Sequence, residues 1–193
     1  MDDRPASPPE PMSRGIGMHG MRDAARALYG EAGMRAIAAR LPEPTRRETM
    51  DQIVLPVSWY PVRFTLHWQD AIWDGPAARS DERFFQFVQR SIEQGFGRMR
   101  RFFLRLASVE RMTARAPEMW RYQHTHGTLT SLVRGSTAQI TLRDHPFVKD
   151  GLSRKATAEA WKHIVALSGR KGARSTFGVE GPDTLVVRIS WND

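Results

Sequence analysis

The last third of the chain alternates apolar and polar positions with a period of two. The final expected strand, Thr184 to Trp191, carries apolar residues at Leu185, Val187, Ile189 and Trp191. The same alternation recurs earlier, at Ala138, Ile140 and Leu142 and again at Phe177 and Val179. This pattern is typical of strands with one face on a core and the other toward solvent. A helix expected from about 153 to 167 separates two strand pairs, which predicts a β-β-α-β-β unit with a four-stranded antiparallel sheet.

The part before this sheet repeats its apolar residues every three or four positions, as amphipathic helices do. The longest expected helix starts after Ser80 and carries its stripe at Phe84, Val88, Ile92, Phe96, Met99, Phe103 and Leu106. Gly30 interrupts an earlier helical pattern, Thr45 to Glu48 reads as a capping box, and Pro61 suits a helix start. We therefore predict an α+β fold, with a helical lobe of about five helices packed with the sheet.

Composition divides the chain into a tail and one folded part. Residues 1–17 are rich in proline and charge, which predicts a disordered tail. We expect one α+β domain over 18–193, with its helical part at 18–122 and its sheet-helix part at 123–193.

Bulk composition restricts the function classes. The 193 residues include no cysteine, which excludes disulfides and thiolate chemistry, and no apolar run is long enough to cross a membrane. The start of the chain lacks the pattern of a secretory signal, so a cytoplasmic location is expected. The net charge of +8 raises nucleic acid as a partner, but the basic residues are spread along the whole chain.

His124 and His126 form a His-x-His pair, whose rings would share one face of an extended strand. Asp144 and His145 would add ligands if the sheet brought them near. The pair is a weak metal candidate, because polar residues at the start of a strand are the commoner explanation. We expect no metal and no other cofactor.

A second candidate is an arginine stripe, Arg98, Arg101 and Arg105, opposite the apolar face of the long helix. Such a stripe can follow phosphates and would make the protein a basic nucleic-acid-binding protein. A solvated helix face is the commoner explanation of such a stripe, so nucleic acid is the alternative and not the favoured partner.

Six tryptophans are many for this length. The ligand-binding candidates are aromatic: Trp59, Trp68, Trp73, Phe96 and Trp120. They would line a pocket for a flat or hydrophobic molecule, or they would simply form core. We find no arrangement of nucleophile, base or paired carboxylates that indicates an enzyme.

Several segments together resemble a known family. These are Trp59-Tyr60-Pro61, the stretch from Ala116 to Tyr122 with Gly127, the stretch from Leu142 to Pro146, and the terminal Ile189-Ser190-Trp191. They resemble an uncharacterised paralogous family of myxobacterial proteins. More distantly, the arrangement is similar to heme-NO-binding, 4-vinyl reductase and TRAPP-like domains.

The wider resemblance implies a pocket that senses a small or hydrophobic molecule, often in a dimer. In heme-NO-binding domains, a histidine on the helix before the sheet holds iron and a Tyr-x-Ser-x-Arg motif holds the propionates. Residues 108–116 contain no histidine, and the motif is absent. Heme is therefore not expected, and neither is the metal function of cysteine-bearing 4-vinyl reductase domains.

The expected function is a non-enzymatic regulatory module that senses a small or hydrophobic ligand or mediates protein interaction. A homodimer, or a partner protein, would cover the exposed sheet edge.

Overall fold

The computed structural model describes residues 10–106 and 108–192, and the side chains of 10–95 and 108–192. Contacts divide the chain into two compact units. One unit combines the residues up to Ser13 with those from Arg98 onward, and the other spans Arg14–Gly97. The division falls inside the long helix α4 (Asp81–Leu106). The next helix, α5 (Val109–Gln123), already packs on the sheet.

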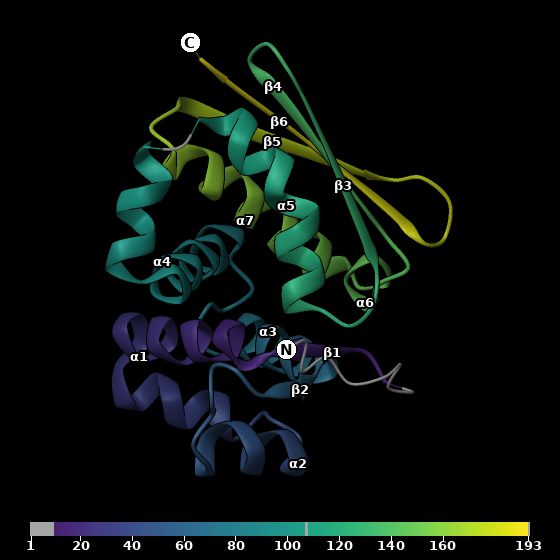
Figure 1. Cartoon of the computed structure of the whole chain (residues 1–193). Helices are drawn as coiled ribbons and strands as arrows, with labels where there is room; N and C mark the ends of the chain where they lie inside the picture. The colour runs from purple at the N-terminus through teal and green to yellow at the C-terminus, as the bar shows by residue number, and fades with distance from the viewer. Residues whose placement is uncertain (1–9, 107, 193) are drawn as a thin grey trace. The chain divides into compact units, whose positions relative to one another are not determined.

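The sheet unit contains the predicted β-β-α-β-β arrangement (Figure 1). Its strands are β3 (Thr128–Arg134), β4 (Thr137–Arg143), β5 (Lys171–Val179) and β6 (Thr184–Asn192), all antiparallel, in the order β3-β4-β6-β5. Between the hairpins lie the short α6 (Pro146–Lys149) and α7 (Gly151–Leu167). The α+β fold with a four-stranded sheet is confirmed.

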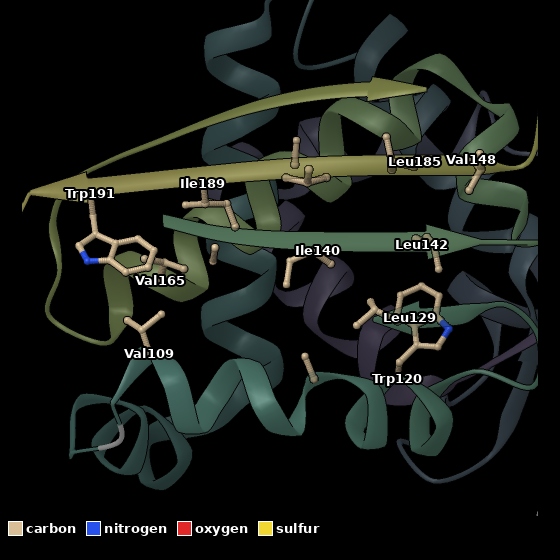
Figure 2. Packing of buried hydrophobic residues seen from close by; sticks show 14 residues of the cluster. Val109, Trp120, Leu129, Ile140, Leu142, Val148, Val165, Leu185, Ile189 and Trp191 are labelled. Carbon is tan, nitrogen blue, oxygen red and sulfur yellow. The ribbon is translucent and has the colours of Figure 1, made fainter. Parts of the chain in front are cut away.

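One face of this sheet carries the core. Helix α5 (Val109–Gln123) packs on β3, and α7 packs on β5 and β6. Figure 2 shows the side chains that meet between the strands and these helices. The alternating residues predicted to point inward in β4 and β6 are all buried: Ala138, Ile140, Leu142, Leu185, Val187, Ile189 and Trp191. Each large apolar side chain so enclosed contributes roughly 1.5–3 kcal/mol of transfer free energy.

Strand β5 is an edge of the sheet and is less well covered. Phe177 and Val179 pair with Val187 and Leu185, so they share the inner face as predicted. They nevertheless remain 42% and 40% exposed. Alternation correctly indicates the face of a residue, but only the position of its strand in the sheet decides the depth of burial.

The other unit is mainly helical. It contains α1 (Gly15–Ala38), α2 (Glu43–Arg46), a π-helical turn η1 (Arg47–Asp51), α3 (Val62–Asp74) and the first part of α4 (Asp81–Leu106). Its short strand is β2 (Trp59–Pro61), whereas of β1 (Met12–Arg14) only Arg14 belongs to this unit. Helix α1 breaks at Gly30, which has φ of 60° and ψ of −167°. Of the segment predicted as a tail, residues 1–9 lie outside the description, while β1 and the start of α1 lie inside it.

A buried hydrogen-bond chain ties α3 to the segment before it. The Trp68 indole Nε1 donates to Thr49 Oγ1 at 2.8 Å, and the Thr49 hydroxyl donates to the carbonyl of Thr45 at 2.7 Å. The hydroxyl of Thr45 lies 2.7 Å from Nδ1 of His67. The capping-box prediction at Thr45 was therefore wrong, because Thr45 lies inside α2 and its hydroxyl makes a tertiary contact instead.

Candidate functional site

Two chain segments bring four ring side chains together in the sheet unit. Trp120 lies in the last turn of α5, and His124 is the residue that ends this helix. His145 and Phe147 lie where β4 gives way to α6. We call these four residues the imidazole–aromatic cluster.

The rings of the cluster contact one another closely. The His124 imidazole stacks on Trp120, with centroids 3.9 Å apart and planes inclined by 21°. His145 meets Trp120, His124 and Phe147 edge to face, at centroid distances of 4.9, 5.1 and 4.4 Å. Such edge-to-face contacts suit the ring quadrupoles and hold each ring in a defined orientation.

The backbone bonding of His145 determines its tautomer. It caps α6, and its Nδ1 accepts a hydrogen bond from the amide of Phe147 at 3.3 Å. A neutral imidazole that accepts at Nδ1 carries its proton at Nε2. Nε2 is buried and has no hydrogen-bond acceptor in the part of the chain that the structure describes. The cluster thus encloses one N–H donor whose surroundings are aromatic.

Burial also keeps the two cluster histidines neutral. Desolvation, together with the nearby His124 and His126, lowers the pKa of His145 to about 2, and His145 is only 1% exposed. Desolvation lowers the pKa of His124 to about 3. The His124 residue as a whole is only partly buried, although its Nδ1 is enclosed. We therefore regard His145 as the more strongly perturbed of the two.

A glycine makes room for the cluster. Gly127 has φ of +79°, and a Cβ placed there would lie 2.8 Å from Cβ of His145 and 3.1 Å from the carbonyl oxygen of Arg143. A side chain at this position would be strained and would collide with the cluster. The turn into β3 and the end of β4 therefore approach closely only because residue 127 is glycine.

Strand β1 and a hydrogen bond from Trp120 hold residues 124–126, which contain the His-x-His pair. The Thr125 amide donates to the carbonyl of Met12 at 3.0 Å, the Met12 amide donates to the Thr125 hydroxyl at 2.9 Å, and Ser13 bridges to His124. Trp120 Nε1 donates to the carbonyl of His126 at 3.2 Å. His126 Nδ1 lies 2.9 Å from the hydroxyl of Thr125.

The structure brings the predicted metal candidates together only in part. His145 does approach His124, as the sheet topology would allow. However, within residues 10–106 and 108–192 no group of three histidine, aspartate or glutamate side chains is placed to hold a metal ion. Of the His-x-His pair, only His124 belongs to the imidazole–aromatic cluster, which the spacing of the pair did not indicate. No pattern in the sequence indicated that Phe147 would belong to a site.

The predicted aromatic ligand residues fall in different units. Trp68 is completely buried in the helical unit, and Trp73 packs edge to face on Phe84 at 5.7 Å. Trp59 is partly buried beneath the Arg14 guanidinium, 4.6 Å from the ring centroid. Trp120 belongs to the sheet unit.

The remaining predicted site side chains lie outside the described residues. These are Phe96 and the arginine stripe of α4, namely Arg98, Arg101 and Arg105.

Comparison with solved structures assigns the fold. An oxygen-binding H-NOX domain related to soluble guanylate cyclases, solved as its oxygen complex, matches with a TM-score of 0.62 at 12% identity, covering 93% of this chain and 95% of that one. The Fe(II) unliganded H-NOX protein from K. algicida matches with a TM-score of 0.64 at 10% identity, covering 93% and 97%. No protein-family model and no curated protein matches the sequence.

The chain therefore has the fold of H-NOX, or heme-NO-binding, domains. These matches do not support the myxobacterial family or a paralogous origin. Among the described residues, no helix is long and apolar enough to cross a membrane.

The residues of this chain do not fit heme. Helix α5, which precedes the sheet, contains no histidine at any of its 15 positions. Its buried residues are Val109, Thr113, Ala116 and Trp120, none of which would ligate iron. His124, just beyond the helix, stacks on Trp120 with its Nδ1 enclosed. We therefore assign no role to heme in this protein.

Proposed function

We propose that this chain is a cytoplasmic, non-enzymatic regulatory module that senses a small or hydrophobic molecule without heme. The observation that carries the proposal is the H-NOX fold over 93% of the chain, combined with an α5 that has no histidine. One of the structures with this fold is described as an oxygen-binding domain related to soluble guanylate cyclases. Such a fold without its iron ligand suits the sensing of another molecule.

The imidazole–aromatic cluster is the sensing centre that we favour. Aromatic rings supply apolar contact area, and the buried His145 Nε2–H supplies one donor for an acceptor atom of the ligand. A buried donor without an acceptor costs roughly 1–3 kcal/mol, so a ligand that accepts its hydrogen bond would recover this free energy on binding. The favoured ligand is therefore largely apolar, with one hydrogen-bond acceptor.

Native mass spectrometry of the protein as purified tests this function. We expect a co-purifying organic molecule, and no stoichiometric complex or Soret band after addition of hemin. His145→Phe keeps the aromatic volume but removes the Nε2 donor, so it should reduce the occupancy of the co-purified molecule. His19→Gln, a change in the other unit, should not. The bare chain alone in the spectrum, or a hemin complex at one equivalent, would contradict the proposal.

We also propose that the module self-associates through the β5 edge of its sheet. An edge strand presents backbone groups that a second strand can pair with. In support, β5 carries the half-exposed Phe177 and Val179 at this edge.

A further inference from the structure

The outer face of the sheet carries arginines that the strand register aligns. One row of paired residues crosses all four strands. It runs from Arg134 on β3 through Thr137 on β4 and Ser190 on β6 to Arg174 on β5. In the next row, Arg188 lies between Gln139 and Thr176. With strands about 4.8 Å apart, the backbones of Arg134 and Arg174 are separated by roughly 14 Å, and Arg188 lies between them.

These rows border a hollow of about 300 Å³ that is open to solvent. Its lining includes all three arginines together with Thr137, Gln139, Thr176 and Ser190 of the outer face. No carboxylate belongs to the lining, so the hollow offers many hydrogen-bond donors and a charge of about +3. Among the described residues, Arg134 and Arg174 form no ion pair, and Arg188 reaches Glu180 only at 3.6 Å on the surface.

We propose that this hollow, which we call the sheet hollow, binds a compact organic phosphate with at least two negative charges. Guanidinium groups bind phosphate oxygens through paired N–H donors, and the hydroxyls can serve the remaining oxygens. Arg134 and Arg174 stand at the two ends of the row and Arg188 lies between them. Three cations spread in this way suit a ligand with two phosphate groups better than a ligand with a single phosphate group. The sheet hollow lies on the face opposite the core, so it is separate from the imidazole–aromatic cluster.

Size and charge favour a small molecule over a polynucleotide. A volume of about 300 Å³ is at the lower end of the range for small-molecule sites, roughly 300–1,000 Å³. The strong salt dependence of nucleic-acid binding is described for proteins that make about 6–10 phosphate contacts, whereas the sheet hollow gathers three arginines.

Calorimetric titration with inorganic pyrophosphate at low ionic strength tests this assignment. We expect saturable 1:1 binding, at least tenfold tighter than binding of inorganic phosphate. Arg174→Gln and Arg188→Gln should each weaken pyrophosphate binding about tenfold, because each removes a charge-assisted contact. Amide NMR shifts on titration should concentrate at Gln139, Thr176 and Ser190.

Arg143→Gln is the matched control, since Arg143 is on the same outer face of β4 but outside the sheet hollow. It removes the same charge and should change the affinity less than twofold. Glu180→Gln should strengthen binding about twofold, because it releases Arg188 from its surface partner.

Three results would overturn the proposal. The first is the absence of pyrophosphate binding at low salt, and the second is equal weakening by Arg143→Gln and Arg174→Gln, which would indicate a diffuse charge effect. The third is a single-stranded oligonucleotide that binds more tightly than pyrophosphate, together with an Arg174→Gln variant that binds neither of them. This result would make the surface a nucleic-acid site.

Discussion

At the scale of single residues, the histidines of the sheet unit have chemistry that the sequence leaves open. His145 is buried, caps a helix through Nδ1 and contacts three rings. His67, in the other unit, also has its pKa lowered, mainly by burial. Burial holds the His145 side chain neutral, and this makes the stability of the fold dependent on pH.

The first prediction concerns acid sensitivity. The pKa of His145 is about 2 in the folded protein and about 6.5 when unfolded, so the unfolded state binds more protons between these values. Stability therefore rises with pH across this window, and lowering the pH from 7 to 5 should cost roughly 2 kcal/mol through this residue. Urea unfolding at both pH values should show that the free energy of unfolding of His145→Phe falls by a correspondingly smaller amount between pH 7 and pH 5.

Phe147→Leu serves as the control, because it changes a ring that contacts His145 without removing a titratable group. Its pH dependence should match that of the original protein. If the stability of His145→Phe depends on pH as strongly as that of the original protein, the pKa of His145 does not differ between the folded and unfolded states as we infer.

The second prediction concerns the hydroxyl of Thr49, which accepts from the buried Trp68 indole. Thr49→Val keeps the shape but leaves the indole N–H without its acceptor, so the free energy of unfolding should fall by about 1–3 kcal/mol. Thr49→Ser retains the hydroxyl and should lose clearly less in the same chemical denaturation experiment. Equal losses for both variants would mean that the methyl group, and not the hydrogen bond, matters here.

At the scale of elements, α1 and α4 approach closely where glycines face each other. A Cβ at Gly20 would lie 2.6 Å from the carbonyl oxygen of Ser91 and 3.0 Å from the amide of Gly95. Both contacts are with backbone, which cannot rotate away. The spacing of these two helices therefore depends on the absence of a side chain.

The third prediction follows from this contact. Gly20→Ala should destabilise the protein by about 1–3 kcal/mol, because the helices must move apart. Gly17→Ala lies in the same helix with nothing within 4 Å, so it should stabilise by up to about 1 kcal/mol through higher helix propensity. Thermal unfolding of the pair measures both effects, and a neutral or stabilising Gly20→Ala would show that the close approach is absent.

At the scale of the whole molecule, the chain has the H-NOX fold. The sheet, its flanking helices and their order match structures that share only 10–12% of the sequence. Helix α5 provides apolar contacts and no iron ligand. The fold thus constrains the shape of the module, whereas its side chains decide what it binds.

The fourth prediction concerns assembly. If β5 pairs with a second copy, light scattering should give a dimer mass for the original protein. Phe177→Lys combined with Val179→Lys should give a monomer, because charges on an edge strand oppose pairing. Val57→Lys changes an exposed residue of the other unit and should leave the dimer intact. A monomeric original protein would remove the basis for self-association.

Local pattern was sufficient to predict much of the fold. Period-two alternation in β4 and β6 and the turns between strands predicted the β-β-α-β-β unit, and Gly30 predicted the break in α1, because each depends on neighbours in the sequence. The Thr45 capping box failed because a tertiary partner, His67, competes for the hydroxyl.

Only the tertiary structure decided the two sites. His124 and His145 are 21 positions apart, and Arg134 and Arg174 are 40 apart, so their proximity depends on strand register and on turns such as the one at Gly127. The sequence by itself determined which face of each strand is apolar, since alternation is a local property. Which strands are neighbours, and therefore which side chains meet, depends on long-range pairing that no local pattern encodes.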